Sequence, residues 1–362
     1  MAAVDPADLP EEDPIDRARR VAQVQKVIAR IEPWCRLLGL PWICPLWRLM
    51  LGEAPGPHLR EIWRGLVVPV LSIAGFLLLW GWLAPQVQTS LGAIPGPAQV
   101  WEQVGVLHTE AQAEADRETA FYERQSAKNA ELVAAGKANE VKTRPYAGKP
   151  TYADQILTSL QTVFMGFALA SVVAIPLGIL AGLSATANAA IQPWVQVFKP
   201  VSPLAWLPIV TMTVSALVDA DSAVPKSFIV SAVTVTLCSL WPTLINTALG
   251  VATIDKDLVN VGRVLRLSLW TRITKLVLPS ALPLIFTGLR LSLGVGWMVL
   301  IAAEMLSQNP GLGKFVWDEF QNGSSDSLAR IMVAVFTIGL IGLVLDRVMV
   351  ALQSLLTYQG GR

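Results

Sequence analysis

Long apolar stretches alternate with short polar segments over most of this chain. A helix needs about 20 residues to cross a bilayer, and all of the stretches except the third reach this length. They occupy residues 62–84, 156–183, 204–218, 227–249, 282–305 and 328–350. The pattern predicts an all-α membrane protein with six transmembrane helices. Prolines break the start of the third stretch, at Pro200, Pro203 and Pro208, and Pro242 is expected to kink the fourth.

Small residues recur at every fourth position in two of these stretches. They are Gly166, Ala170, Ala174, Gly178 and Gly182 in the second stretch, and Gly288, Ser292 and Gly296 in the fifth. Residues at this spacing share one helix face, and small side chains let helices approach closely in lipid. We expect this face to pack against another helix, and the alternative is that it lines a transport pathway.

Composition supports membrane insertion and narrows the function. The 362 residues are 53% hydrophobic and 15% charged, with a mean hydropathy of +0.51, which is typical of a polytopic membrane protein. A net charge of +1 gives no reason to expect nucleic acid as a partner. The two histidines, His58 and His108, are predicted to lie on opposite sides of the membrane, so we expect neither catalysis nor a metal site.

The polar segment at residues 254–279 has a pattern of its own. Apolar residues recur there at helical spacing, first Leu258, Val261, Val264 and Leu265, and then Leu269, Ile273 and Leu276. The pattern predicts two short helices joined by a tight turn, with Ser268 capping the second. Five cations, Lys256, Arg263, Arg266, Arg272 and Lys275, occupy the other faces. Together with nine Lys or Arg before residue 65, they place this segment and both chain termini in the cytoplasm.

Two further regions flank the membrane core. Residues 1–61 are expected to form a cytoplasmic arm with amphipathic helices that either lie at the membrane interface or remain in solution. Residues 85–150 form a predicted periplasmic excursion, of which residues 108–150 are either helical or a solvated linker. The first transmembrane helix, residues 62–84, joins these two regions, and residues 151–356 form a core domain of five helices.

The 254–279 segment resembles the coupling loop of bacterial ABC importer permeases. Its ending, Leu276-Val277-Leu278-Pro279, matches the Ile-x-Leu-Pro ending of that signature. Its start departs, because Asn260-Val261-Gly262 replaces Glu-Ala-Ala and Arg266 replaces a glycine. We call residues 254–279 the coupling segment. An ordinary cytoplasmic loop is the alternative interpretation.

Other motifs are similar to the nitrate, sulfonate and taurine branch of these permeases, and most similar to its nitrate and bicarbonate members. They are IPGPAQVW, SPLAWLPIV, SLWPTLINT, GLRLSLGVGWMVLIAAEML and GLGKFVWDEF. The resemblance implies a type I importer permease fold, to which the N-terminal arm is an addition. It also implies a homodimer in membrane lipid, two separate ATPase subunits that use ATP and Mg²⁺, and a periplasmic substrate-binding protein. The chain contains no Gly-x-x-x-x-Gly-Lys-Ser/Thr loop, so we expect it to bind no nucleotide or other cofactor.

The coupling segment contains one group of candidate residues, and the fifth apolar stretch contains another. The ATPase-coupling group is Leu258, Asn260, Val261, Gly262, Arg263, Val264, Leu265, Arg266, Ser268, Leu269, Ile273 and Pro279, with Arg263 and Arg266 at the rim of an apolar centre. The translocation-pathway group is Arg290, Ser292, Gly296, Trp297 and Glu304. Nitrate is the expected substrate, and bicarbonate, cyanate and an alkylsulfonate or taurine are the alternatives.

Arg290 needs a specific explanation because an ionisable group inside a bilayer is costly. Its guanidinium group could attract a planar anion through paired N–H donors. Alternatively, it forms an ion pair, with Asp346 or Glu304 as candidate partners. Glu304 is fourteen residues away, or about 21 Å along one helix, so it cannot pair with Arg290 within that helix. Two other classes remain open for the whole chain, an ion-gradient-driven transporter and a membrane scaffold or sensor.

Overall fold

The computed structural model describes residues 25–28, 31–32, 35, 42–50, 55–89, 92–137, 139, 141–219, 222–324 and 326–357. The side chains of residues 55, 256, 259 and 263 are outside this description. Most of the predicted N-terminal arm therefore lies outside the described residues. The chain divides into two units, residues 1–80 and 81–362, each of which is described by itself.

The described part of the first unit is helical and includes the start of the first span. Helices α2 (Ile43–Met50) and α3 (Pro55–Ile62) lead through a π-helical turn, Trp63–Val67, into α4 (Val68–Leu83). An Arg48–Glu32 ion pair with an N–O distance of 2.7 Å lies beside a small cluster of buried apolar side chains that includes Ile28, Cys35 and Cys44. Helix α4 continues into the second unit.

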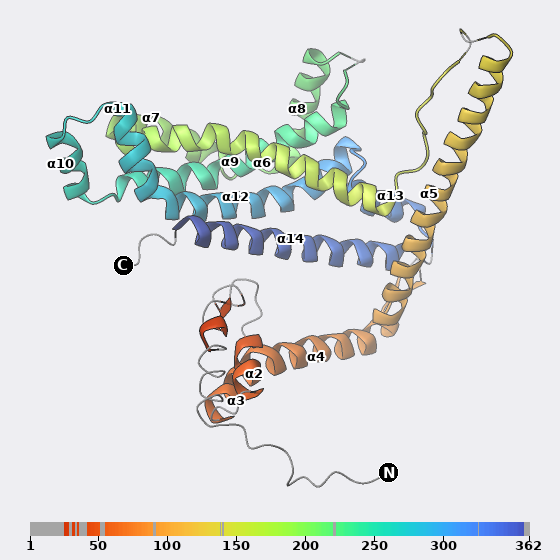
Figure 1. The fold of residues 1–362 in the computed structure, drawn as a ribbon, viewed down its shortest axis with the longest axis horizontal. Coiled ribbons are helices and arrows are strands. Elements are labelled where there is room, and N and C mark those ends of the chain that lie inside the picture. The colour runs from red at the N-terminus through yellow and green to blue at the C-terminus, as the bar shows by residue number, and fades with distance from the viewer. Residues whose placement is uncertain are drawn as a thin grey trace, which may run out of the picture. The chain divides into compact units, whose positions relative to one another are not determined.

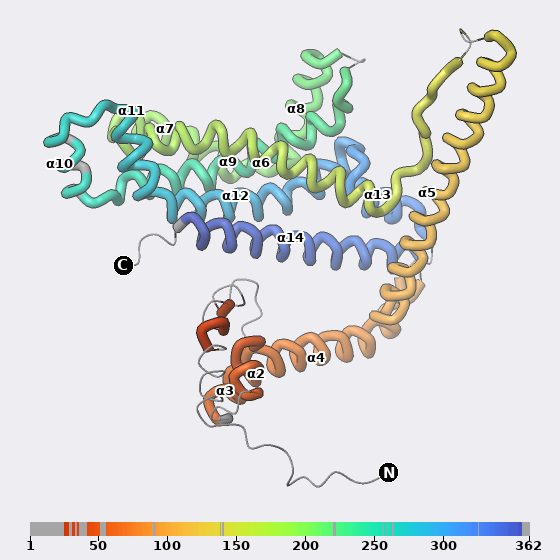
Figure 2. The backbone as a smooth tube through the Cα atoms, in the orientation of Figure 1, coloured from red at the N-terminus to blue at the C-terminus, as the bar shows by residue number. Residues whose placement is uncertain are grey.

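The second unit is almost entirely helical (Figures 1 and 2). A 3₁₀ turn, Ala84–Gln86, and a two-stranded antiparallel ribbon, β1 (Gln88–Thr89) and β2 (Gly92–Ala93), precede the helices. The helices are α5 (Pro97–Ala134), α6 (Tyr152–Leu183), α7 (Ala185–Phe198), α8 (Pro203–Leu217), α9 (Lys226–Ala252), α10 (Lys256–Val264), α11 (Leu269–Arg272), α12 (Leu278–Ser307), α13 (Leu312–Asn322) and α14 (Ser327–Thr357).

Five described helices are long and apolar enough to cross a membrane, which confirms the all-α prediction. They cover Gly56–Gln86, Tyr152–Leu183, Lys226–Ala252, Leu269–Ser307 and Ser327–Leu356. The third predicted span is instead a pair, α7 and α8, bent by 101° at a short break, and the pair counts as a sixth span only if both helices belong to one crossing. The break contains Pro200, as the sequence predicts. Helix α7 lies between the second and third apolar stretches that the sequence predicts.

Helix α9 lies between α6 and α12, and the stripes of small residues form both contacts. A methyl group on Gly178 would lie 2.8 Å from the carbonyl oxygen of Leu244 on α9. A methyl group on Gly288 of α12 would lie 3.0 Å from the carbonyl oxygen of Pro242 on α9. Ala170 and Ala174 are fully buried on the same face of α6. The predicted packing role of these stripes is therefore confirmed.

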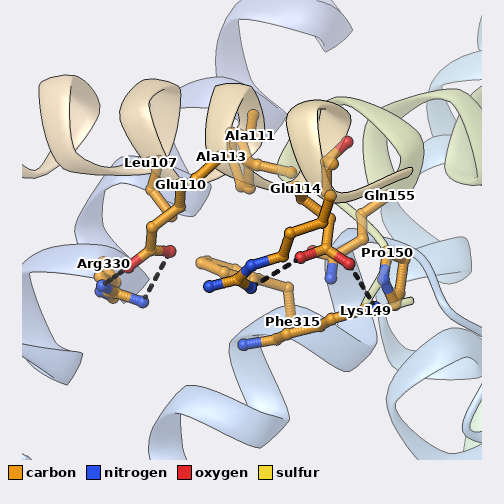
Figure 3. Close-up of a pocket in the computed structure, with 13 residues that line it drawn as sticks. Leu107, Glu110, Ala111, Ala113, Glu114, Lys149, Pro150, Gln155, Phe315 and Arg330 are labelled. Carbon is orange, nitrogen blue, oxygen red and sulfur yellow. Dashed lines mark hydrogen bonds and ion pairs between the residues drawn. The ribbon is translucent and has the colours of Figure 1, made fainter. Parts of the chain in front are cut away.

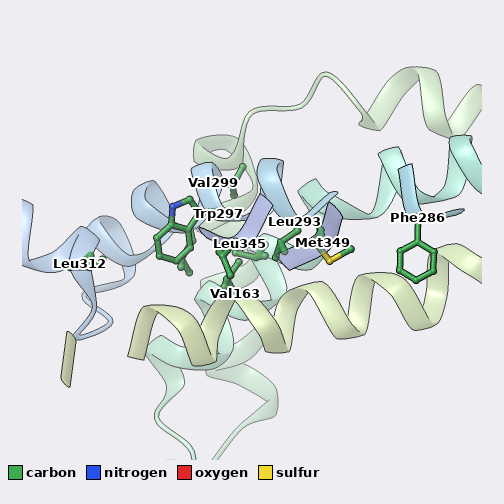
Figure 4. Packing of buried hydrophobic residues seen from close by; sticks show 10 residues of the cluster. Val163, Phe286, Leu293, Trp297, Val299, Leu312, Leu345 and Met349 are labelled. Atoms are coloured by element: carbon green, nitrogen blue, oxygen red, sulfur yellow. The ribbon is translucent and has the colours of Figure 1, made fainter. Parts of the chain in front are cut away.

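A buried apolar cluster fills the centre of this bundle (Figure 4). It joins Val163 of α6 and Val235 of α9 to Leu293, Trp297 and Leu300 of α12. The indole Nε1 of Trp297 donates a hydrogen bond of 3.0 Å to the carbonyl oxygen of Ile338, which ties α12 to α14. Burial of these side chains fixes α12 against its neighbours along most of its length.

Two π-helical turns interrupt the spans, and each is followed by a proline two residues later. Val68 donates its N–H to the oxygen of Trp63 ahead of Pro69, and Leu278 donates to Ile273 ahead of Pro279. A proline ring clashes with the carbonyl group four residues back and provides no N–H, so a wider turn accommodates it without ending the helix. The second turn makes α11, residues 273–277 and α12 one continuous helical segment, Leu269–Ser307.

Candidate coupling and pathway sites

The coupling segment folds as two short helices joined by a tight turn, as its sequence predicts. Helix α10 ends where Leu265 and Leu267 donate N–H groups to the oxygens of Val261 and Gly262. Ser268 then caps α11 by accepting a 3.2 Å hydrogen bond from the N–H of Thr271. The segment lies at one end of the α6–α9–α12 bundle, and α13 lies at the other (Figure 1).

The apolar side chains of the coupling segment face outward. Val264 is 82% exposed, Leu265 63% and Leu269 72%, and Leu258 and Val261 are also exposed. Asp257, Asn260, Val261, Val264 and Leu265 line a shallow groove of about 390 Å³ on α10. Such a contiguous apolar surface at the end of a membrane bundle is typical of a protein-binding site. We call the exposed apolar side chains of this helix and its end, Leu258, Val261, Val264 and Leu265, the α10 patch.

Other predicted coupling residues have internal roles. Gly262 is buried, and a methyl group there would lie 3.2 Å from Leu276, so α10 packs closely on the π-helical turn. Ile273 is half-buried in that turn, and Pro279 is exposed at the start of α12. The side chain of Arg263 lies outside the described residues, so its predicted position at the rim stays a prediction.

Arg266 adopts a left-handed backbone conformation, with φ 47°. It occupies the position at which the coupling-loop signature has glycine. A side chain other than glycine in this region costs about 1–2 kcal/mol, because Cβ crowds the following carbonyl oxygen. The turn therefore forms despite the substitution, supported by the Leu267–Gly262 hydrogen bond.

We expect Arg266→Gly to protect this turn rather than disrupt it. Relief of the strained conformation outweighs the greater backbone freedom of glycine by roughly 0.5 kcal/mol. Hydrogen exchange at the amide of Leu267 should slow about twofold. Arg266→Val, which adds a β-branched side chain at positive φ, should accelerate exchange, and slower exchange in that variant would contradict this account.

The structure places most of the pathway candidates within helix contacts. Ser292 Oγ accepts a 3.1 Å hydrogen bond from the N–H of Thr243 and also bonds to the carbonyl oxygen of Ser239. It therefore bridges two α9 groups four residues apart, next to Pro242. Gly296 faces Val235 of α9 at close range. Ser292, Gly296 and Trp297 are all buried in this chain.

Arg290 pairs with Asp346 of α14. Its Nη2 lies 2.8 Å from Oδ2, and Nε contacts Oδ1, so the pairing is bidentate. Asp346 was one of the two partners that the sequence offered for Arg290. The side chains of Arg290 and Asp346 are 44% and 38% exposed, so the pair faces outward from the chain.

Glu304 is fully buried at the opposite end of α12 from the coupling segment. Its Oε2 accepts hydrogen bonds of 2.8 Å from Ser159 Oγ and 2.9 Å from the N–H of Gly313. Ser159 also accepts from the N–H of Leu312 at 2.9 Å. Glu304 and Ser159 thus satisfy free N–H groups at the start of α13, which otherwise lack partners.

Several functional candidates were absent from the sequence predictions. Trp270 is 75% exposed beside Leu269 and extends the apolar surface, and its position next to the predicted apolar stripe could have indicated this. Ser159 and Gly313 lie far from Glu304 in sequence, so no local pattern reveals their contact.

An apolar helix bundle with an exposed helical segment at one end is the architecture of a membrane permease subunit, and the family match assigns that class. Residues 174–358 match the family described as binding-protein-dependent transport system inner membrane component. The chain therefore belongs to this family of ABC importer permeases, and it is not itself an ATPase.

Several relatives are named as bicarbonate or nitrate permeases. The chain is 36% identical to the bicarbonate transport system permease protein CmpB of Synechococcus elongatus over 297 residues, which cover 81% of this chain and 90% of that protein. It is 41% identical to the nitrate import permease protein NrtB of Leptolyngbya laminosa over 192 residues, which cover 53% of this chain and 64% of that protein. The NrtB protein of Synechococcus elongatus is 39% identical over 193 residues, with coverages of 53% and 66%.

Proposed function

We propose that this chain imports nitrate across the bacterial inner membrane as the permease subunit of an ATP-driven transporter. The supporting observation is the 41% identity to a nitrate import permease, which is concentrated in 192 residues. Bicarbonate is the second candidate, because the similarity to a bicarbonate permease extends over 81% of the chain.

The proposed transporter contains two copies of this chain, two ATPase subunits and a periplasmic binding protein. The α10 patch enters a groove on the ATPase, with both chain termini on that cytoplasmic side. Because α10 packs on the π-helical turn through Gly262 and Leu276, ATPase closure displaces the continuous segment Leu269–Ser307. At 1.5 Å per residue, its 39 residues span about 58 Å, enough to carry a displacement across the bilayer. The dimer then alternates between outward-open and inward-open states.

Uptake by cells tests the substrate directly. A strain that lacks this chain is complemented with it, and accumulation of labelled nitrate is measured with excess unlabelled bicarbonate or taurine. We expect complemented uptake that bicarbonate and taurine do not reduce. Strong competition by bicarbonate, together with uptake of labelled bicarbonate, would assign that anion to the transporter instead.

Variants of the Arg290–Asp346 pair distinguish a role of Arg290 in the transport pathway from a purely structural role. Arg290→Met leaves Asp346 without its partner in the membrane, at a cost of about 3 kcal/mol. We therefore expect less assembled complex and less uptake. Arg290→Lys keeps the charge but loses the bidentate geometry, so its effects should be milder.

The double variant Arg290→Met/Asp346→Leu removes both charges and should restore assembly, as measured by co-purification with the ATPase. If uptake is restored as well, the pair is purely structural. If assembly returns without uptake, Arg290 contributes to anion passage. Normal uptake by the single Met variant would remove Arg290 from the pathway.

A further inference from the structure

Helix α5 and the chain that returns from it, residues 141–150, form a braced hairpin. The side-chain amide of Gln125 forms two hydrogen bonds with the backbone of Arg144. Its Nε2 donates to the carbonyl oxygen at 2.8 Å, and its Oε1 accepts from the N–H at 2.7 Å. Asn129 donates to the oxygen of Lys142 at 3.3 Å. These bonds hold the returning chain along the helix, although residues 141–150 are neither helix nor strand. We call α5 with residues 141–150 the α5 hairpin.

The base of the α5 hairpin is fixed to the membrane bundle (Figure 3). Arg330 at the start of α14 pairs with Glu110 of α5 and with Glu319 of α13. Glu114 accepts hydrogen bonds from the hydroxyl of Tyr146 at 2.7 Å and from the N–H of Lys149 at 3.1 Å. The Tyr146 bond, together with Arg117, lowers the pKa of Glu114, so this carboxylate is charged at neutral pH.

A cationic groove lies farther along the hairpin, between α5 and the returning chain. It encloses about 410 Å³ and is lined by Phe121, Arg124, Gln125, Lys128, Asn129, Leu132, Lys142 and Arg144. The lining contains four cations and no carboxylate. Within the described part of the chain, none of the four forms an ion pair. The carboxylates of Glu118, Glu123 and Glu131 are on the same helix but do not line the groove.

The arrangement of the four cations suits a surface rather than one small ion. Arg124 and Lys128 are four residues apart on one helix face, and Lys142 and Arg144 both line the groove from the returning chain. Arg124 is fourteen residues from Glu110, or about 21 Å along α5, so the groove lies well beyond the contacts with the bundle. Helices that rest on lipid need a broad apolar face, and Phe121 and Leu132 are the only apolar side chains in this lining.

We propose that the cationic groove of the α5 hairpin docks an acidic surface of the periplasmic substrate-binding protein. This proposal rests on the proposed function, because it requires the end of the bundle opposite α10 to face the periplasm. The hairpin is fixed at that end, against α14 and α6 (Figure 1). Opposed charges across such an interface accelerate encounter and set orientation, and their effect weakens as salt is added.

Charge reversal in the groove tests the proposal. The permease and its ATPase subunits are reconstituted in nanodiscs of neutral lipid, and ATPase stimulation is titrated with nitrate-loaded binding protein. For Lys128→Glu/Arg144→Glu we expect the half-saturating concentration to rise about tenfold at low salt, with the rate at saturation retained. The difference should shrink several-fold in about 0.5 M salt. Lys128→Arg/Arg144→Lys preserves the charge and should behave as the wild type.

A second control places a single charge reversal elsewhere. Lys226 begins α9 outside the groove, and Lys226→Glu should leave the half-saturating concentration unchanged. An equal shift in this control would overturn the groove as a specific site. An unchanged value in the double reversal would also overturn docking, although stimulation itself would still support an importer. A defect confined to nanodiscs with anionic lipid would assign the groove to headgroups instead. Absent stimulation of the wild type would contradict the proposed function.

Discussion

Val264→Asp and Leu265→Asp are each expected to uncouple ATP hydrolysis from transport. Both side chains are mostly exposed in this chain, so a carboxylate at either position leaves the internal packing of the permease intact. In the proposed complex they lie at the apolar centre of the ATPase contact. Burial of an unpaired charge there costs about 3 kcal/mol, which weakens association roughly 100-fold.

Three measurements isolate this effect. Membrane insertion should equal that of the wild type, co-purification of the ATPase should fall sharply, and substrate-dependent ATPase activity should be lost. Val264→Leu keeps the apolar surface and should retain coupling. Lys275→Asp changes charge at an exposed position on the π-helical turn and should have a much smaller effect. Persistent coupling in the aspartate variants would show that the α10 patch is not the contact.

Glu304→Ala is expected to release α13 from the bundle. The substitution leaves the N–H of Gly313 and the hydroxyl of Ser159 without their acceptor and opens a cavity around a fully buried position. Together these changes cost about 3 kcal/mol or more. Faster proteolysis at residues 308–313 and a lower midpoint of thermal unfolding in detergent should follow.

Glu304→Gln provides the matched control, because it preserves side-chain volume and one carbonyl acceptor. Its effect should be clearly smaller than that of alanine. Gly311→Ala disturbs the same contact by a steric clash, because the added methyl group would lie 2.2 Å from Glu304 Oε1. It should destabilise α13 as alanine at position 304 does. Equal stability of all three variants and the wild type would contradict a role for Glu304 in holding α13.

Local sequence patterns predicted the features that depend on local physics. Hydropathy located five spans but not the bent α7–α8 pair. The four-residue stripes predicted close helix packing because the small residues share one helix face. The cap at Ser268 follows from the hydrogen bond that a serine hydroxyl offers to a free N–H nearby. Asp346 could be named as a partner of Arg290 because few ionisable groups lie within spans.

Features that depend on distant residues could not be predicted in the same way. Ser159 and Glu304 are 145 positions apart, and only packing of α6 against α12 brings them together. The left-handed conformation at Arg266 contradicts the local preference of arginine and is imposed by the turn. The polar composition of residues 108–150 could not distinguish a helix from a solvated linker. The structure shows helix α5 followed by a returning chain that hydrogen bonds from Gln125 and Asn129 hold against it.

Reconstitution in proteoliposomes tests the central claim most directly. The chain is inserted together with its ATPase subunits, the binding protein is placed on the outside, and anion entry is measured with and without ATP on the inside. We predict entry only when all components and hydrolysable ATP are present, and none for the chain alone. Anion entry by the chain alone, at an undiminished rate and without nucleotide, would contradict a permease that a separate ATPase drives through the coupling segment.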